Sequence, residues 1–116
     1  MASIIKSFAQ VTDNNFEKKV LKNSLPVIVI FERSIWGAAH IMGPILKKII
    51  STYAGKIEIY RYNMDKNFSI SRFYRVQAGI AILVFNNSSV VNKTGVISFT
   101  KLQEIIEPLI NGYVIH

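Results

Sequence analysis

The sequence predicts an α/β fold with a central mixed β-sheet flanked by helices, and two observations lead to this prediction. Segments with the apolar spacing of a helix alternate with short apolar segments typical of strands. The alternation ends in two adjacent strands, 80–85 and 90–93, and a terminal hairpin after alternating elements favours a mixed sheet. Because 116 residues are one domain's worth of chain, we expect a single domain over residues 1–116.

The first elements are a helix and a buried strand. Phe16 and Val20 recur at helical spacing after an N-cap segment, Asp13–Asn15, and predict a helix over about residues 13–23. Residues 26–31 read Pro-Val-Ile-Val-Ile-Phe, a continuous and mostly β-branched run. Such a run is typical of a strand that is buried on both faces.

The long helix of the chain is expected around residues 44–53, where apolar residues again follow helical spacing. We expect it to begin near Trp36, to kink at Pro44 and to end at Gly55. Residues 56–64 alternate between apolar and polar side chains and predict the next strand.

The second half of the chain contains a short helix, a hairpin and a final helix. The short helix is expected over residues 69–74. The two hairpin strands are joined by Asn-Asn-Ser-Ser at residues 86–89, a composition that suits a tight turn. The last helix is expected over residues 100–111, because its leucines and isoleucines fall on one face.

Composition limits the function only loosely. The formal net charge of +7 is compatible with a solubilising surface, an acidic protein partner, an anionic surface or nucleic acid. No aromatic residues interleave with a basic stripe as in single-strand binders, so a nucleic-acid partner is disfavoured. No apolar run approaches the roughly 20 residues of a membrane helix, and we expect no membrane association. The expected location is the cytoplasm or an equivalent compartment such as a plastid stroma.

The ordered set of motifs resembles the thioredoxin family over about residues 8–110. The segments that carry the resemblance are Val11–Phe16, Leu25–Phe31, Ile41–Leu46 with its proline, Tyr53–Lys56, Asn63–Asp65, Tyr74–Val76 and Gly95. The resemblance implies a thioredoxin fold.

The sequence departs from the family where thioredoxins perform their chemistry. Thioredoxins carry Trp-Cys-Gly-Pro-Cys at the start of the long helix, and the aligned segment here is Ile35-Trp36-Gly37-Ala38-Ala39. Disulfide exchange requires a thiolate, and this chain contains no cysteine at any position. The sequence therefore predicts a protein without thioredoxin redox activity and with no catalytic residue or cofactor of that kind.

Three further positions lack the residue type that thioredoxins carry around the active site, or the partner of that residue. Ile30 stands where the family buries an aspartate, and we expect it to be buried in the central strand. Arg61 stands where the family has a lysine near that aspartate, so this partner is missing. Ile80 stands where the family has a cis-proline, and we expect a trans peptide bond between Gly79 and Ile80, because a non-proline cis bond costs about 3–4 kcal/mol.

Other site chemistry is weakly supported. The two histidines, His40 and His116, do not make a metal site, which needs three or four matched ligands. Ser34 has no base placed to activate it, and an N-cap role is favoured. Glu32 and Arg61 are expected to form a surface ion pair of little energetic value.

The resemblance also implies a peptide-binding surface that does not depend on the missing cysteines. In thioredoxins the motif loop, the cis-proline loop and the glycine loop after the hairpin hold an extended peptide. The corresponding residues here are small or apolar: Trp36, Gly37, Ala38, Gly79, Ile80, Gly95 and Val96. Trp36 is either an exposed interface anchor or a packing residue, and the sequence leaves both open.

The resulting functional hypothesis is non-covalent protein binding, as an adaptor, a chaperone-like factor or an assembly subunit. The partner is expected to be a protein, and an acidic one if Arg33 and Arg75 surround the surface. Two alternatives remain: nucleic-acid binding through the positive charge, and an enzyme with non-thiol chemistry.

Overall fold

The computed structural model describes residues 8–33, 38–77 and 79–110. Its elements run along the chain in the order strand, helix, strand, helix, strand, helix, strand, strand, helix. They are β1 (Gln10–Val11), η2 (Glu17–Leu21), β2 (Val27–Glu32), α1 (Ala38–Thr52), β3 (Glu58–Asn63), α2 (Ser69–Phe73), β4 (Ile80–Asn86), β5 (Ser89–Thr94) and α3 (Phe99–Ile110).

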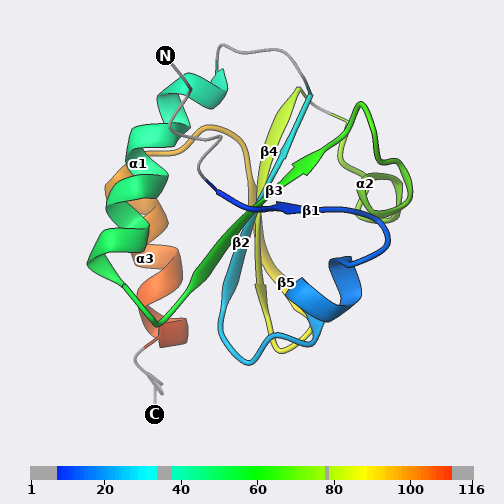
Figure 1. The fold of residues 1–116 in the computed structure, drawn as a ribbon. Coiled ribbons are helices and arrows are strands. Elements are labelled where there is room, and N and C mark those ends of the chain that lie inside the picture. The colour runs from blue at the N-terminus through cyan, green and yellow to red at the C-terminus, as the bar shows by residue number, and fades with distance from the viewer. Residues whose placement is uncertain (1–7, 34–37, 78, 111–116) are drawn as a thin grey trace.

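The strands form one mixed sheet in the order β1-β3-β2-β4-β5. β1, β3 and β2 are parallel, whereas β4 is antiparallel to both β2 and β5. Helices α1 and α3 cover one face, and η2 and α2 lie on the other (Figure 1). The predicted α/β fold with a central mixed sheet flanked by helices is confirmed.

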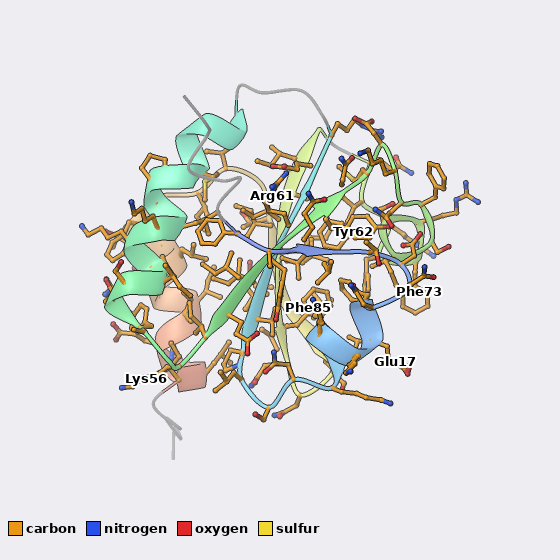
Figure 2. The ribbon with its side chains drawn as sticks, in the orientation of Figure 1. Glu17, Lys56, Arg61, Tyr62, Phe73 and Phe85 are labelled. Carbon is orange, nitrogen blue, oxygen red and sulfur yellow. The ribbon has the colours of Figure 1, made fainter. Side chains whose placement is uncertain are left out.

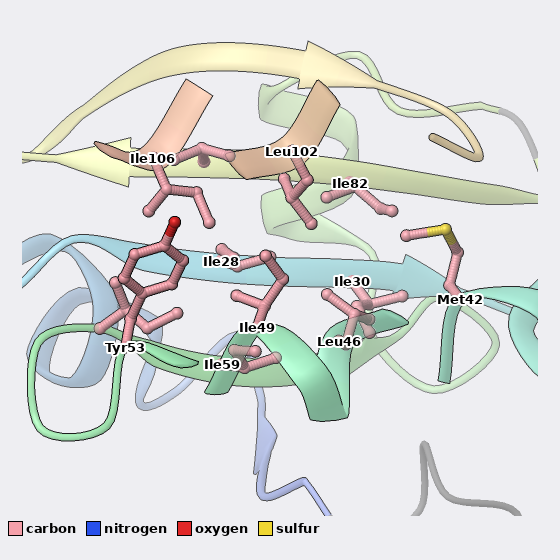
Figure 3. Close-up of a cluster of buried hydrophobic side chains, with 12 residues drawn as sticks. Ile28, Ile30, Met42, Leu46, Ile49, Tyr53, Ile59, Ile82, Leu102 and Ile106 are labelled. Carbon is pink, nitrogen blue, oxygen red and sulfur yellow. The ribbon is translucent and has the colours of Figure 1, made fainter. Parts of the chain in front are cut away.

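The apolar core is divided into two layers by the sheet. The layer beneath α1 and α3 is built mainly from isoleucines (Figure 3): Ile28, Ile30, Met42, Leu46, Ile49, Tyr53, Ile57, Ile59, Ile82, Val84, Leu102 and Ile106. The opposite layer contains more aromatic side chains, among them Phe16, Phe31, Tyr62 and Phe85. Because alternate residues of a strand point to opposite faces, β2 supplies both layers and is buried along its whole length.

Turn geometry agrees with the sequence at two points. Gly55 closes the segment after α1 with a φ of +77°, a conformation that glycine adopts without steric cost. Asn87 and Ser88 also have positive φ, 52° and 69°, and form the two-residue loop between β4 and β5. Positive φ at both loop residues is the requirement of a type I′ hairpin, so the predicted hairpin is confirmed.

Two expectations about the elements are corrected, and one strand was missed. The first helix is shorter than expected and is a π-helical segment, Glu17–Leu21. Asp13 does not cap it, because the Asp13 carboxylate accepts hydrogen bonds from the backbone at the start of α2. The sequence also gave no indication of β1, whose two residues pair with Arg61 and Tyr62 of β3. Pro44 lies inside α1 as expected, whereas the expected start near Trp36 lies outside the described residues.

None of the helices in the described residues is long and apolar enough to cross a membrane.

Candidate functional site

Four residues of the predicted binding surface lie together where β2 ends and β4 begins. We call Gly79, Ile80, Gly95 and Val96 the Ile80 edge. Ile80 is the cross-strand neighbour of Glu32, the last residue of β2. The backbone N–H of Arg33 donates to the carbonyl of Gly79 at 3.3 Å. Gly95 follows directly after the last β4–β5 pair and therefore lies at the same end of the sheet.

The start of α1 lies next to this edge. The backbone N–H of Ile97 is 3.5 Å from Sδ of Met42, which joins the loop after β5 to the first turns of α1. Ala38 and Ala39 are the first residues of α1, and their side chains are not among those described. Trp36 and Gly37 lie outside the described residues, so both readings of Trp36 remain predictions.

The Ile80 edge is open and apolar. Gly79 and Gly95 are exposed, Ile80 is half-buried, and the side chain of Val96 is 47% exposed. A methyl group added at Gly95 would meet no heavy atom within 4 Å. A second polypeptide backbone could therefore approach these residues closely.

The backbone of Ile80 has an unused side. The peptide bond between Gly79 and Ile80 is trans, as predicted. Within the described residues, β5 pairs with β4 no further than Ile82. The carbonyl of Gly79 points toward β2, and alternate strand residues direct their backbone groups to opposite neighbours. The N–H and C=O of Ile80 consequently face the side on which β5 has already ended.

Beneath α1, the position where thioredoxins bury a carboxylate is apolar. Ile30 is fully buried, as predicted, and packs with Ile28, Leu46 and Ile82 in the layer under α1 and α3 (Figure 3). Its cross-strand neighbour in β3 is Arg61.

The expected surface pair between Glu32 and Arg61 is in fact largely buried. Nε of Arg61 donates to Oε1 of Glu32 at 3.2 Å, and the two side chains are only 12% and 10% exposed. β2 continues one residue further than predicted and includes Glu32. Because alternate residues of a strand share a face, the side chain of Glu32 lies on the same face of the sheet as that of Ile30. Arg61, on β3 next to the central strand β2 (Figure 2), thus has a carboxylate partner after all. Oε2 of Glu32 is buried without a hydrogen-bond partner in the described part of the chain.

A second feature lies beside the edge and was only partly foreseen. A cavity of about 440 Å³ opens between the end of β3, α2 and the segment that follows α2. We call it the arginine cavity; its lining residues are Arg33, Met64, Asp65, Phe68, Ser71, Arg72, Arg75, Val76 and Gln77. The sequence had suggested Arg33 and Arg75 as cations near the binding surface, but only the fold adds Arg72 and encloses a volume.

The carboxylate of Asp13 fixes the position of α2 and thereby the wall of this cavity. It accepts the backbone N–H groups of Phe68, Ser69 and Ile70 at 3.0–3.1 Å and the hydroxyl of Tyr62 at 2.6 Å. Burial is the largest single influence and would raise the pKa of Asp13, but the four hydrogen bonds together outweigh it, so the pKa is lowered. The same burial and the bond to Asp13 raise the pKa of the Tyr62 hydroxyl.

Across the described residues, no group of three or more metal-ligating side chains is close enough to hold an ion. Ser34 and His116 lie outside the described residues, and His40 lies in α1 with a side chain that is not described.

The chain is similar to known proteins over most of its length. The thioredoxin family model matches residues 7–108. The thioredoxin of Buchnera aphidicola subsp. Acyrthosiphon pisum is 31% identical over 103 residues, 88% of this chain and 95% of that protein. Thioredoxin 1 of Nostoc sp. is 29% identical over 100 residues (85% and 94%), and the thioredoxin of Thiocapsa roseopersicina is 35% identical over 88 residues (76% and 96%).

Proposed function

Because the chain belongs to the thioredoxin family and yet contains no cysteine, we propose that it is redox-inactive and acts by non-covalent protein binding. The observation that carries this proposal is the Ile80 edge, an exposed apolar rim beside backbone groups that no strand in the described residues pairs with. Its role would be that of an adaptor, a chaperone-like factor or an assembly subunit.

The proposed mode of binding is addition of an extended peptide to the Ile80 edge. A peptide strand laid beside Ile80 would hydrogen-bond to its N–H and C=O, which no described strand pairs with, and such bonds supply affinity without regard to sequence. Gly95 leaves room for the peptide backbone, Gly79 is exposed, and Val96 offers an apolar contact. Trp36, at the position of the thioredoxin nucleophile, would supply the large apolar anchor that interfaces favour.

Site-specific photo-crosslinking tests this proposal with a matched control. Val96 and Val91 are exposed to nearly the same extent, 47% and 46%, but Val96 lies on the Ile80 edge and Val91 in the middle of β5. Each is replaced by p-benzoylphenylalanine in the full chain, expressed in its native cell. We expect Val96 to give discrete crosslinked protein bands that Trp36→Ala removes, and Val91 to give none.

Two results would contradict the proposal. Equal crosslinking from Val91 and Val96 would mean that exposure alone determines capture. Discrete bands from Val91 with none from Val96 would move the partner to the outer strand of the sheet.

A further inference from the structure

The arginine cavity has an unbalanced charge. Within the described chain, its lining contains three arginines and a single aspartate. Arg33 approaches Asp65 at 3.6 Å between Nη1 and Oδ1, with both side chains more than 40% exposed. Arg72 and Arg75 are exposed and form no ion pair with any described residue. Two guanidinium groups at the cavity are therefore exposed to solvent, and the single aspartate of the described lining is ion-paired with Arg33.

The backbone that carries Arg75 is held in an unusual conformation. Its φ is +56°, in the left-handed region that residues with a Cβ rarely occupy. Nζ of Lys93, from β5, donates to the carbonyls of both Tyr74 and Arg75 at 3.0 Å. The N–H of Val76 donates to the carbonyl of Ser71 at 2.8 Å. These bonds fix the turn after α2, so the position of the Arg75 backbone is set before any ligand arrives.

The rest of the lining is suited to a chain with aliphatic stems. Met64 and Val76 form a buried apolar floor, and Phe68 is 59% exposed at the rim. Phe73 projects from the outer side of α2 with 75% of its surface exposed (Figure 2). A methylene stem could rest on the floor while its charged end meets a guanidinium.

The cavity is also connected to the Ile80 edge. Arg33 lines the cavity and at the same time donates its backbone N–H to Gly79. Gln77, another lining residue, lies only two positions before Gly79 in the chain. A polypeptide that lies along the Ile80 edge has the arginine cavity directly beside its path.

We propose that the arginine cavity binds the carboxylate side chains of an acidic segment in the protein partner. This inference rests on the proposed function, because it assigns the chemistry of the partner that the Ile80 edge binds. Guanidinium groups bind carboxylates through paired N–H donors, which gives direction as well as charge attraction. Singly charged carboxylates spaced along a peptide suit arginines that come from two places in the chain, Arg33 after β2 and the pair Arg72 and Arg75 at the end of α2.

The test is binding of a fluorescent ten-residue glutamate peptide to the full chain, with a ten-residue glutamine peptide as reference. The double variant Arg72→Gln/Arg75→Asn removes both exposed guanidiniums, and asparagine tolerates the positive φ at position 75. The matched control Lys18→Gln/Lys47→Gln removes the same charge from exposed positions on η2 and α1. Thermal unfolding establishes that each variant is folded before binding is measured.

We expect the arginine variant to lose about tenfold in affinity for the glutamate peptide, as removal of charge-assisted hydrogen bonds implies. The lysine control should change about twofold or less at 0.15 M salt, where screening acts over about 8 Å. Equal losses in both variants would show diffuse charge attraction and overturn the proposal. Tighter binding of inorganic phosphate than of the glutamate peptide would overturn it as well.

Amide NMR shifts separate failure of this inference from failure of the proposed function. Shifts at Arg72, Arg75 and Gln77 report occupation of the cavity, and shifts at Ile80 and Gly95 report occupation of the edge. Shifts in the cavity alone support the acidic-segment site and count against strand addition at the edge. Shifts at the edge alone leave the proposed function standing and overturn the arginine cavity as an anion site.

Discussion

Breaking the pair between Glu32 and Arg61 should destabilise the fold far more than an ordinary ion pair would suggest. Replacing Arg61 by methionine keeps most of the side-chain volume and leaves the Glu32 carboxylate without its cation. Because that carboxylate is only 10% exposed, water cannot fully compensate the loss. Removing one partner of a buried pair typically costs 3–5 kcal/mol, and we take about 3 kcal/mol, because the pair lies at the end of β2 and keeps some contact with solvent.

The two further variants of the cycle isolate the pair. Glu32→Leu should cost about 2 kcal/mol, because the long side chain of Arg61 can turn its charge toward water. The double variant Glu32→Leu/Arg61→Met should lie within about 1 kcal/mol of the wild type, since apolar replacement of both partners is often neutral. The single losses sum to about 5 kcal/mol, so the double variant should be at least about 4 kcal/mol more stable than that sum predicts.

Urea denaturation of the four proteins measures these free energies of unfolding. Thermal unfolding gives an independent value: an unfolding entropy of about 0.24 kcal/mol per kelvin for 116 residues converts 3 kcal/mol into a drop in Tm of about 12 °C. Lys101→Met is the matched control, because it breaks the exposed pair with Glu104 and should cost less than about 0.5 kcal/mol. Additive losses in the double variant would refute the coupling of the two side chains.

Three other predictions follow from the same structure. In an insulin-reduction assay with a suitable reductase, the purified protein should show no turnover above buffer, because it has no thiolate; sustained turnover would contradict the loss of redox function. Ile30→Asp should lower the free energy of unfolding by about 2–3 kcal/mol, because it buries a carboxylate and the neighbouring Arg61 limits the loss. A change below about 0.5 kcal/mol would mean that water reaches position 30. Asp13→Asn should cost about 1 kcal/mol at pH 7. Because the pKa of Asp13 is lowered in the folded state, the stability that its charge contributes is complete above the unfolded pKa of about 3.9 and disappears as the pH falls through the folded pKa. The free energies of unfolding of wild type and variant, measured by urea denaturation, should therefore converge in acid. A difference between them that stays constant with pH would exclude the carboxylate charge as its cause.

The sequence was sufficient for those parts of the fold that local patterns encode. The continuous apolar run of β2 and the turn residues Asn87 and Ser88 each carry a local physical signal, and each was predicted correctly. β1 was missed because its two residues contain no periodicity, and its existence depends on pairing with Arg61 and Tyr62, about 50 residues away.

The candidate site was harder to predict because its key contacts span long stretches of chain. Asp13 looked like the cap of its own helix, but its hydrogen bonds reach α2 across more than 50 residues. Glu32 was expected at the surface because the apolar pattern stops at Phe31. Only the extension of β2 by one residue places its side chain on a buried face. Arg72, on α2, joins Arg33 only when α2 packs beside the end of β3.

The positions of the charges bear directly on the proposed loss of redox chemistry. A carboxylate at position 30 would lie beneath α1, near the helix start where the thioredoxin thiols lie. In this chain that position is Ile30, and the nearest acid on the same face of β2 is Glu32, two residues nearer the end of the strand. There the carboxylate forms an ion pair with Arg61, and its role is structural. A cysteine pair engineered at Trp36 and Ala39 would therefore lack the buried acid of its family, and Ile30→Asp would have to accompany it. We expect the two cysteines alone to form a disulfide that exchanges slowly with dithiothreitol and the triple variant to exchange faster; equal rates would show that the acid at position 30 is dispensable in this fold.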